Sequence, residues 1–332
     1  MKPVVLIDVM NTVFRCHWAY RNLSYEGEPT GVQYGFLKII NDLRETVSPR
    51  ILWCWDHGVP VPGAAKPTNW RDPVVKAYKA TRKHDDAEYR AVLAQLPRLA
   101  WLINVLGYSS VSVMGLEADD VIGILATELS RNNEVLIYSN DHDFYQLLGP
   151  RVKVLVPTKT KGDFRICTQQ DVEREYGIQI NRFAEFLALG GDQSDNIKPL
   201  RGMGPKTALK LLKSGVRLAN PLSAQPVAFQ QKYGSVWEAI QTSYYASRIP
   251  TSWQDPRIRS CVAAQGVPKY CADQAVPPRE VQQQFFQFLA ERDMITLLAI
   301  RRKFYQSSGE PICPTVQSPK VVPPAQRRQT LI

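Results

Sequence analysis

The stretch Val4-Val5-Leu6-Ile7-Asp8 is a short, continuous apolar run that ends on a carboxylate. The same pattern recurs twice, at residues 51–55 followed by Asp56 and at residues 135–138 followed by Asp141. Apolar runs without alternation are typical of strands that are buried on both faces. Segments with helical periodicity separate these runs, at 34–43, 89–106 and 118–129. The sequence therefore predicts an α/β fold with a mostly parallel sheet.

Acidic residues gather at the expected ligand-binding edge of this sheet. Parallel strands end at one edge, and ligands of such sheets bind outside it. A further acidic group, Glu117-Ala118-Asp119-Asp120, opens the helix predicted at 118–129. A single acid there would be explained by the helix dipole, but the whole set indicates a site. The candidate acids are Asp8, Asp56, Glu117, Asp119, Asp120, Asp141, Asp143, Asp192 and Asp195.

So many carboxylates in one place imply bound cations. Two carboxylates about 5 Å apart repel by roughly 3 kcal/mol at an effective dielectric constant of about 20. Oxygen ligands without a cluster of His or Cys suit Mg²⁺ or Mn²⁺ rather than zinc. A pair of such ions is a standard device for phosphodiester cleavage. His142 lies between two of the acids and is interpreted as a bystander rather than a base.

Composition narrows the class of protein. The 332 residues carry 41 Lys and Arg against 31 Asp and Glu, a formal net charge of +10, which favours a polyanionic partner such as nucleic acid. No window approaches the roughly 18 apolar residues of a membrane span, and the first apolar run is too short for a signal peptide. The six cysteines include no CxxC pair. We therefore expect a cytoplasmic protein with reduced thiols, without a disulfide framework.

Two segments suit nucleic acid. Residues 66–90 hold seven basic and four acidic residues with interleaved Trp70, Tyr78 and Tyr89. Cations and aromatic rings suit phosphates and bases, although a solvated helix face is an equal alternative for such a run. The stretch Gly202-Met203-Gly204-Pro205-Lys206-Thr207 predicts a tight turn into a helix whose first N–H groups face a phosphate.

The second half of the chain is mainly helical in pattern. Helices are predicted at 183–189, 207–213 and 281–302. Residues 214–280 contain no motif that we can assign. Residues 307–332 bring five prolines, basic side chains and little to bury, which predicts a disordered tail.

In this order, the motifs resemble the structure-specific 5' nucleases, which include the 5'-3' exonuclease domain of bacterial DNA polymerase I, bacteriophage 5'-exonucleases and flap endonucleases. The resemblance covers about residues 4–215. It rests on the Asp8 strand with Asn11 and Arg15, Asp56, Asn69-Trp70-Arg71, Tyr78-Lys79-Ala80-Thr81-Arg82, residues 115–120, Asp141-His142-Asp143 and residues 191–207. The chain departs from the family pattern at Val9, Asn140 and Lys198-Pro199, and none of these departures removes a carboxylate.

The resemblance implies a PIN-like catalytic domain over residues 1–180, with a helical arch at about 66–95. It implies a helix-three-turn-helix DNA-binding domain over 181–304, followed by a basic, Pro-rich tail over 305–332. Lys79 and Arg82 match arch bases that contact the scissile phosphate, and Tyr78 is placed to stack near the reacting nucleotide. Asp120 is also expected to be catalytic.

The resemblance also implies the ligands. The tighter of two metal sites, for Mg²⁺ or Mn²⁺, matches Asp8, Asp56, Glu117, Asp119 and Asp120, and the remaining acids match Asp141, Asp143, Asp192 and Asp195. The DNA-binding set is Arg15, Arg71, Tyr78, Lys79, Arg82, Gly202, Gly204, Lys206 and Thr207. In the family, the hairpin at residues 202–207 is often organised around K⁺.

The implied function is a metal-dependent 5'-3' exonuclease or flap endonuclease of DNA replication and repair. It would cut phosphodiesters near the junction of a 5' single strand or flap with duplex DNA, or at an RNA primer. The expected protein is a monomer of a bacterial or phage-infected cytoplasm, with a single-strand-binding protein, clamp or polymerase as further partner. The alternative is a catalytically inactive junction-binding protein of the same fold.

Overall fold

The structure is a computed structural model, and it describes residues 2–48, 50–57, 68–75, 78–79, 87–158, 163–191, 195, 197, 203–292 and 294. Its central sheet has six strands in the order β5-β4-β1-β6-β7-β8. The strands are β1 (Val4–Asp8), β4 (Ile51–Cys54), β5 (Ser109–Val111), β6 (Val135–Tyr138), β7 (Val152–Pro157) and β8 (Phe164–Cys167), and a separate hairpin pairs β2 (Ser24–Tyr25) with β3 (Glu28–Pro29).

The sheet confirms the predicted topology. Strands β5, β4, β1, β6 and β7 are parallel, and only β8 runs antiparallel. The three apolar runs of the sequence form β1, β4 and β6, and β1 lies between the other two. In this register Asp8 lies opposite Cys54, and Ile7 lies opposite Tyr138. The segments that follow these strands therefore begin side by side at one edge of the sheet.

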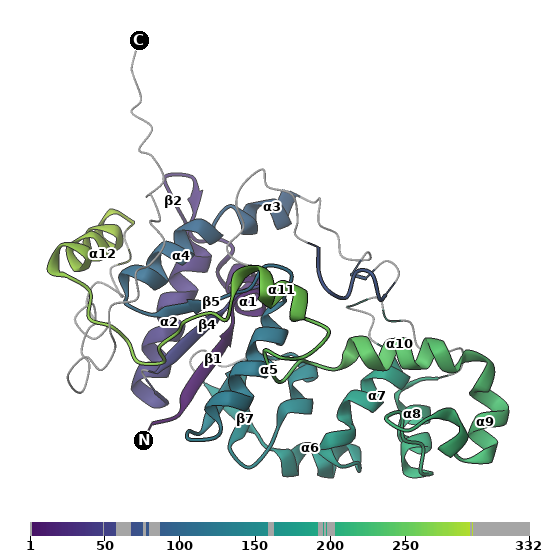
Figure 1. The fold of residues 1–332 in the computed structure, drawn as a ribbon. Coiled ribbons are helices and arrows are strands. Elements are labelled where there is room, and N and C mark those ends of the chain that lie inside the picture. The colour runs from purple at the N-terminus through teal and green to yellow at the C-terminus, as the bar shows by residue number, and fades with distance from the viewer. Residues whose placement is uncertain are drawn as a thin grey trace.

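Helices cover both faces of the sheet, and a further group of helices lies beside one end of it (Figure 1). They are α1 (Val9–Tyr20), α2 (Gly31–Thr46), α3 (Ala87–Leu93), α4 (Leu96–Val105), α5 (Ala118–Leu129), α6 (Gln169–Tyr176), α7 (Phe183–Gly190), α8 (Pro205–Lys213), α9 (Val227–Tyr233), α10 (Trp237–Ser247), α11 (Arg259–Gln265) and α12 (Arg279–Glu291). Short 3₁₀ helices are η1 (His142–Leu147), η2 (Ile180–Arg182), η3 (Leu222–Ala224) and η4 (Gly234–Val236).

Successive strand residues point to opposite faces of the sheet, and each face has its own core. Val5 and Ile7 pack with α1, α2 and α4, whereas Val4 and Leu6 pack with α5. The second of these cores continues into the helical group α7 to α10, because Phe183, Leu212 and Ile240 belong to the same cluster. The helical group is thus joined to the sheet by continuous apolar packing.

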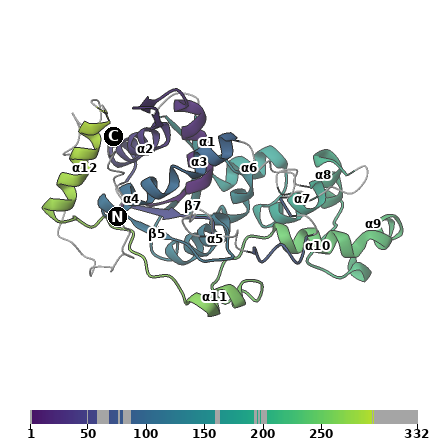
Figure 2. The same ribbon diagram turned by 90° about the horizontal axis from the view of Figure 1, so that it is seen from above.

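The chain returns to the sheet after α10. Figures 1 and 2 show α12 at the opposite end of the molecule from α8 and α9, and α12 packs against α4. Phe285 and Leu289 of α12 are fully buried there. The domain limits predicted from the sequence, 1–180 and 181–304, remain predictions, and residues 305–332 lie outside the described residues.

Several predicted boundaries need correction. The helix predicted at 89–106 is two helices, α3 and α4, and α4 begins with Pro97 in its first turn, where the missing N–H costs little. The described part of the helix predicted at 281–302 is α12, Arg279–Glu291, and residues 293 and 295–302 lie outside the described residues. Cys16, Cys54, Cys167 and Cys261 are free thiols as expected, whereas Cys271 is disulfide-bonded. Within the described residues, no helix has the length and apolarity to cross a membrane.

Candidate active site

The strand-end acids lie where the sheet topology predicts. Asp8 ends β1 and caps α1, because its Oδ1 accepts a hydrogen bond of 3.0 Å from the Asn11 N–H. Its Oδ2 is 3.5 Å from the Ser139 hydroxyl, at the end of β6. Asp141 caps η1 by accepting from the Asp143 N–H at 2.9 Å. The acids of β1 and β6 are therefore fixed by backbone contacts at one edge.

Asp56 connects the end of β4 to the start of α5. Its Oδ1 accepts from the Ala118 N–H at 2.7 Å, and the next residue, His57, donates its N–H to the Leu116 carbonyl at 2.8 Å. His57 has φ of 51°, in the left-handed region that a residue with a Cβ rarely adopts. Backbone strain of this kind tends to persist only where surrounding contacts enforce it. Here the hydrogen bonds to Leu116 and Ala118 hold the His57 backbone and the Asp56 carboxylate in place.

The first turn of α5 supplies three more acids in a capping box. The Glu117 side chain accepts from the backbone N–H of Asp120, and the Asp120 Oδ2 accepts from the Glu117 N–H at 3.0 Å. Glu117 is 5% exposed and Asp120 has no exposed surface. Asp119 is the most accessible of the three. Asp119 is therefore partly open to solvent, whereas Asp120 is fully enclosed.

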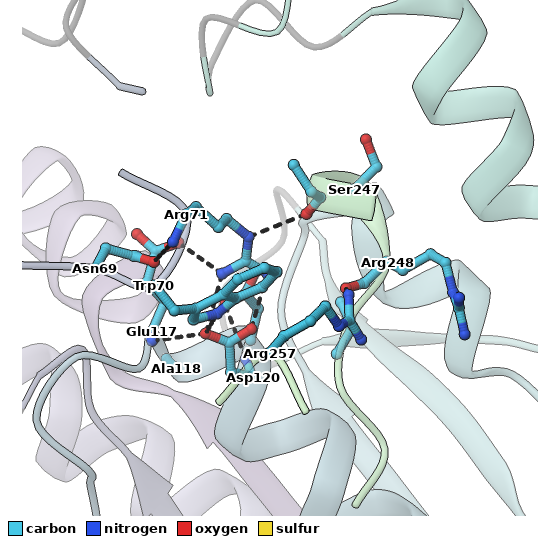
Figure 3. Close-up of polar contacts among 12 residues, drawn as sticks. Asn69, Trp70, Arg71, Glu117, Ala118, Asp120, Ser247, Arg248 and Arg257 are labelled. Atoms are coloured by element: carbon cyan, nitrogen blue, oxygen red, sulfur yellow. Dashed lines mark hydrogen bonds and ion pairs between the residues drawn. The ribbon is translucent and has the colours of Figure 1, made fainter. Parts of the chain in front are cut away.

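Arg71 lies buried among these carboxylates (Figure 3). Its guanidinium donates to both oxygens of Asp120, at 3.0 and 2.8 Å, and to Glu117 at 3.2 Å. Asp119 lies 3.4 Å from the same group. The remaining Nε donates to the Ala246 carbonyl of α10 at 3.0 Å. Arg71 therefore joins the carboxylates of Glu117, Asp119 and Asp120 to the helical group. We call these carboxylates, with the strand-end acids beside them, the acidic pocket.

Trp70 completes the enclosure of Asp120. Its indole N–H donates to Asp120 Oδ2 at 2.9 Å. The indole ring lies between two guanidinium groups, Arg71 at 4.3 Å and Arg257 at 5.1 Å from its centroid, and meets the Tyr245 ring edge-on at 6.0 Å. Arg257 is itself paired with Asp255 and donates to the carbonyls of Tyr245 and Arg248.

Tyr78 and Lys79 close the pocket from the other side. The Tyr78 hydroxyl is 2.7 Å from Glu117 and 2.9 Å from Asp195, and can donate to either carboxylate. The Lys79 ammonium contacts Glu117 and lies 3.5 Å from Asp195. Lys79 has φ of 54°, and its N–H donates to the Asp195 carbonyl at 3.1 Å. The two basic-segment residues thus bring Asp195 to the acids of α5.

Electrostatics differ between the two sides of the pocket. Burial, together with Asp56 and Asp141, raises the pKa of Asp8 to about 7. Burial also raises the pKa of Asp119, and the like charges of Asp120 and Glu117 add to this effect while Arg71 opposes it. Burial would raise the pKa of Glu117 as well, but Lys79 and Arg71 hold it below its usual range. The negative charge is thus compensated at Glu117 and poorly compensated at Asp8.

This donor set fits divalent cations. In the described part of the chain, no three or more Asp, Glu, His or Cys side chains converge in a geometry ready to hold a metal ion. Arg71 and Lys79 lie among the acids instead. Burial and the nearby carboxylates of Asp56 and Asp141 disfavour the ionised form of Asp8 at the edge of β1. A hard cation with oxygen ligands would favour that form.

The other predicted site residues are dispersed or undescribed. Arg15 on α1 contacts the Tyr138 hydroxyl and lies 4.7 Å from that ring, and its Nη1 is buried without a hydrogen-bond partner among the described residues. Gly204 caps α8, Lys206 is exposed and Thr207 is half-buried in its first turn. Asp192, Arg82 and Gly202 lie outside the described residues, as do residues 66–67, 76–77 and 80–86 of the predicted arch, of which α3 is a described helix.

Sequence analysis missed Arg257, Tyr245 and the Ala246 carbonyl. They belong to the segment that carried no motif, and each lies 175 or more positions along the chain from the residue that it contacts, Trp70 or Arg71. No local spacing signals a contact across such a distance. The available signal was compositional, since Tyr244-Tyr245 and Arg248 bring aromatic and basic residues close together.

Comparisons with known proteins identify the family of this chain. The sequence model of the 5'-3' exonuclease, N-terminal resolvase-like domain, matches residues 3–177, and this chain belongs to that family. A 5'-3' exonuclease of Buchnera aphidicola is 33% identical over 266 residues, which cover 78% of this chain and 86% of the relative. The thermostable DNA polymerase I of Thermus filiformis is 34% identical over 256 residues, 75% of this chain but only 29% of the polymerase.

A solved structure shares the fold. The bacteriophage T5 flap endonuclease, in a pseudo-enzyme-product complex with DNA and metal ions, aligns with a TM-score of 0.61 at 16% identity. The alignment covers 87% of this chain and 98% of that one. At this level of identity the likeness concerns the fold, and it extends to the helical group beyond the residues that the family model matches.

Proposed function

We propose that this protein is a two-metal-ion nuclease that cuts DNA near the junction of a 5' single strand or flap with duplex. One observation carries the proposal. Acids from the ends of β1, β4 and β6 and from the start of α5 lie along one edge of the sheet, and two cations of the basic segment contact the α5 acids. Membership of the 5'-3' exonuclease family supports it.

The proposed metal-holding residues are the nine acids Asp8, Asp56, Glu117, Asp119, Asp120, Asp141, Asp143, Asp192 and Asp195. Asp120 differs from the rest, because both of its oxygens already accept hydrogen bonds in the enclosed contacts with Arg71, Trp70 and the Glu117 N–H. Its contribution through these contacts is to hold Arg71 and the start of the basic segment in place. Divalent cations, Mg²⁺ or Mn²⁺, would activate water and stabilise the leaving oxygen when bound.

The chain's own cations would act on the phosphate. Lys79 is the more accessible of the two, because its side chain is 11% exposed and that of Arg71 is 3% exposed. Lys79 is proposed to contact the scissile phosphate, and Glu117 and Asp195, which it contacts here, are among the residues that would hold the cations. Burial raises the pKa of Tyr78 far above its usual value, so its hydroxyl stays protonated and remains a donor. Arg82 is proposed to assist Lys79.

The duplex is proposed to bind at the start of α8. Gly204 leaves open space around its backbone, and Pro205 begins the helix, so the N–H groups of Lys206 and Thr207 are available to a phosphate. Helices α7 and α8 would form the helix-three-turn-helix unit, with K⁺ at the 202–207 hairpin. RNA primers, a single-strand-binding protein, a clamp and a polymerase are proposed partners.

A substrate series tests this function. The full chain is incubated with 5'-labelled flap DNA in Mg²⁺, and a second sample receives excess EDTA. We expect short products cut near the junction in Mg²⁺ and none in EDTA, with product length following flap length. Binding without cleavage in Mg²⁺ and in Mn²⁺ would instead establish the alternative, an inactive junction-binding protein.

A further inference from the structure

A row of alternating guanidinium groups and aromatic rings leads away from the acidic pocket. Arg71 lies 4.3 Å from the centroid of Trp70, Trp70 lies 5.1 Å from Arg257, and Arg257 lies 5.5 Å from the centroid of Tyr245. The two guanidinium groups in this row already have hydrogen-bond partners. Arg71 binds acids, and Arg257 binds Asp255 and two backbone carbonyls. Tyr245, at the outer end, is 43% exposed.

The outer end opens onto a groove of about 320 Å³ between α10 and residues 218–219. Its lining includes Tyr244, Tyr245 and Arg248 from the last turns of α10. Gln241 donates to the Leu218 carbonyl at 2.9 Å and so ties the two walls together. The groove lies next to the acids, because Tyr245 contacts Trp70 and Trp70 donates to Asp120.

Arg248 brings a positive charge to this groove. Arg248 is exposed, lies 5.5 Å from the centroid of the Tyr244 ring, and forms no ion pair with any residue that the structure describes. Figure 3 shows its side chain directed away from the cluster around Arg71 and Trp70. Arg257, by contrast, is held by Asp255 at 2.7 Å. The groove therefore combines one exposed cation with two partly exposed tyrosine rings.

We propose that this groove is a stacking subsite for an unpaired nucleotide of the substrate's single strand. A tyrosine ring accepts the face of any base, and such stacking contributes about 1–3 kcal/mol per base. Arg248 would pair with the adjacent phosphate. The volume is at the low end of the range for small-ligand sites, roughly 300–1,000 Å³, so it admits a base or nucleotide but no duplex. This subsite rests on the proposed function, because it presumes that a DNA strand reaches the acidic pocket.

The test measures binding and cleavage separately. Affinity for a fluorescent single-stranded oligothymidine is measured in EDTA for the wild type, Tyr244→Ala, Tyr244→Phe and Arg248→Ala. Arg131→Ala is the matched control, because Arg131 is also exposed but lies just beyond the C-terminal end of α5, away from the acids at its start. Tyr245 is left intact, since its ring contacts Trp70. Thermal unfolding of each variant confirms that it folds.

We expect Tyr244→Ala and Arg248→Ala to weaken oligothymidine binding by about 5- to 30-fold. Tyr244→Phe and Arg131→Ala should bind within twofold of the wild type. In Mg²⁺, the two weakened variants should lose kcat/KM on a flap substrate and keep it on a nicked duplex without a flap. Wild-type affinity in both variants, a loss no greater than that of Arg131→Ala, or an equal loss on the nicked duplex would overturn the subsite. Failure of every form to cleave, with the binding differences intact, would instead refute the nuclease function alone.

Discussion

The replacement Arg71→Met tests whether Arg71 is an internal counter-ion of the acidic pocket. Methionine keeps the apolar stem and removes five donors, four of which contact Asp120, Glu117 and the Ala246 carbonyl within 3.2 Å. Breaking a buried ion pair by removing one partner costs about 3–5 kcal/mol, because the remaining charge is left buried. We therefore expect the free energy of unfolding to fall by about 3–5 kcal/mol in EDTA at pH 8.

Cations should reverse part of this loss. A ligand that binds only the folded state at 100 times its Kd adds about 2.7 kcal/mol. Because Mg²⁺ no longer shares the carboxylates with Arg71, its stabilising effect should be larger in Arg71→Met than in the wild type. Urea unfolding with and without Mg²⁺ measures both quantities, and Arg131→Met, on the surface, should change stability by no more than about 0.5 kcal/mol. A loss below about 1 kcal/mol in EDTA, or equal Mg²⁺ stabilisation of both proteins, would refute the counter-ion role.

Three further predictions follow from the same geometry. Asp120→Asn should reduce cleavage by about 100-fold, because an amide cannot accept both Arg71 bonds, while flap binding in EDTA stays near normal; unchanged turnover in Mg²⁺ would remove Asp120 from the site. Lys79→Ala should slow single-turnover cleavage of a flap by about 100- to 1,000-fold, and an unchanged rate would show that Lys79 does not reach the phosphate. The pKa of Asp8 is about 7 in the folded protein and 3.8 ordinarily, so the folded state keeps this proton up to a higher pH than the unfolded state does. The free energy of unfolding without metal should therefore fall as pH rises from about 4 to 7. Asp8→Asn should lack this fall and gain about 4 kcal/mol over the wild type at pH 8 in EDTA; parallel pH profiles of the two proteins would contradict it.

The sheet and its acidic edge were accessible from sequence because both depend on local patterns. Strands β1, β4 and β6 are buried on both faces, so their continuous apolar runs stand out, and the acids that end them follow directly. Strands β5, β7 and β8 were missed. Ser109 and Ser110 weaken the apolar signal of β5, and β8 is an edge strand with three exposed or half-exposed residues of four.

The contacts that enclose the acids of α5 could not be predicted from the sequence. Arg71 was predicted as a DNA contact, but its guanidinium is committed to acids and to the Ala246 carbonyl. Nothing in the local sequence shows that α10 returns to the start of the basic segment, because the contact is set by the packing of the helical group. The contacts of Arg257 and Tyr245 with Trp70 could not be predicted for the same reason. The resemblance identified the residue types, and the tertiary fold decided which of them meet.

The proposed function requires that the strand-end carboxylates form a catalytic metal site. The single-turnover rate of flap cleavage by the wild type and by Asp8→Asn across a Mg²⁺ titration, with flap affinity measured in EDTA, tests this requirement. We expect wild-type cleavage that depends on Mg²⁺, a loss of about 1,000-fold or more in Asp8→Asn, and equal affinity of both proteins for the flap. Comparable rates for the two proteins at saturating Mg²⁺ would contradict it.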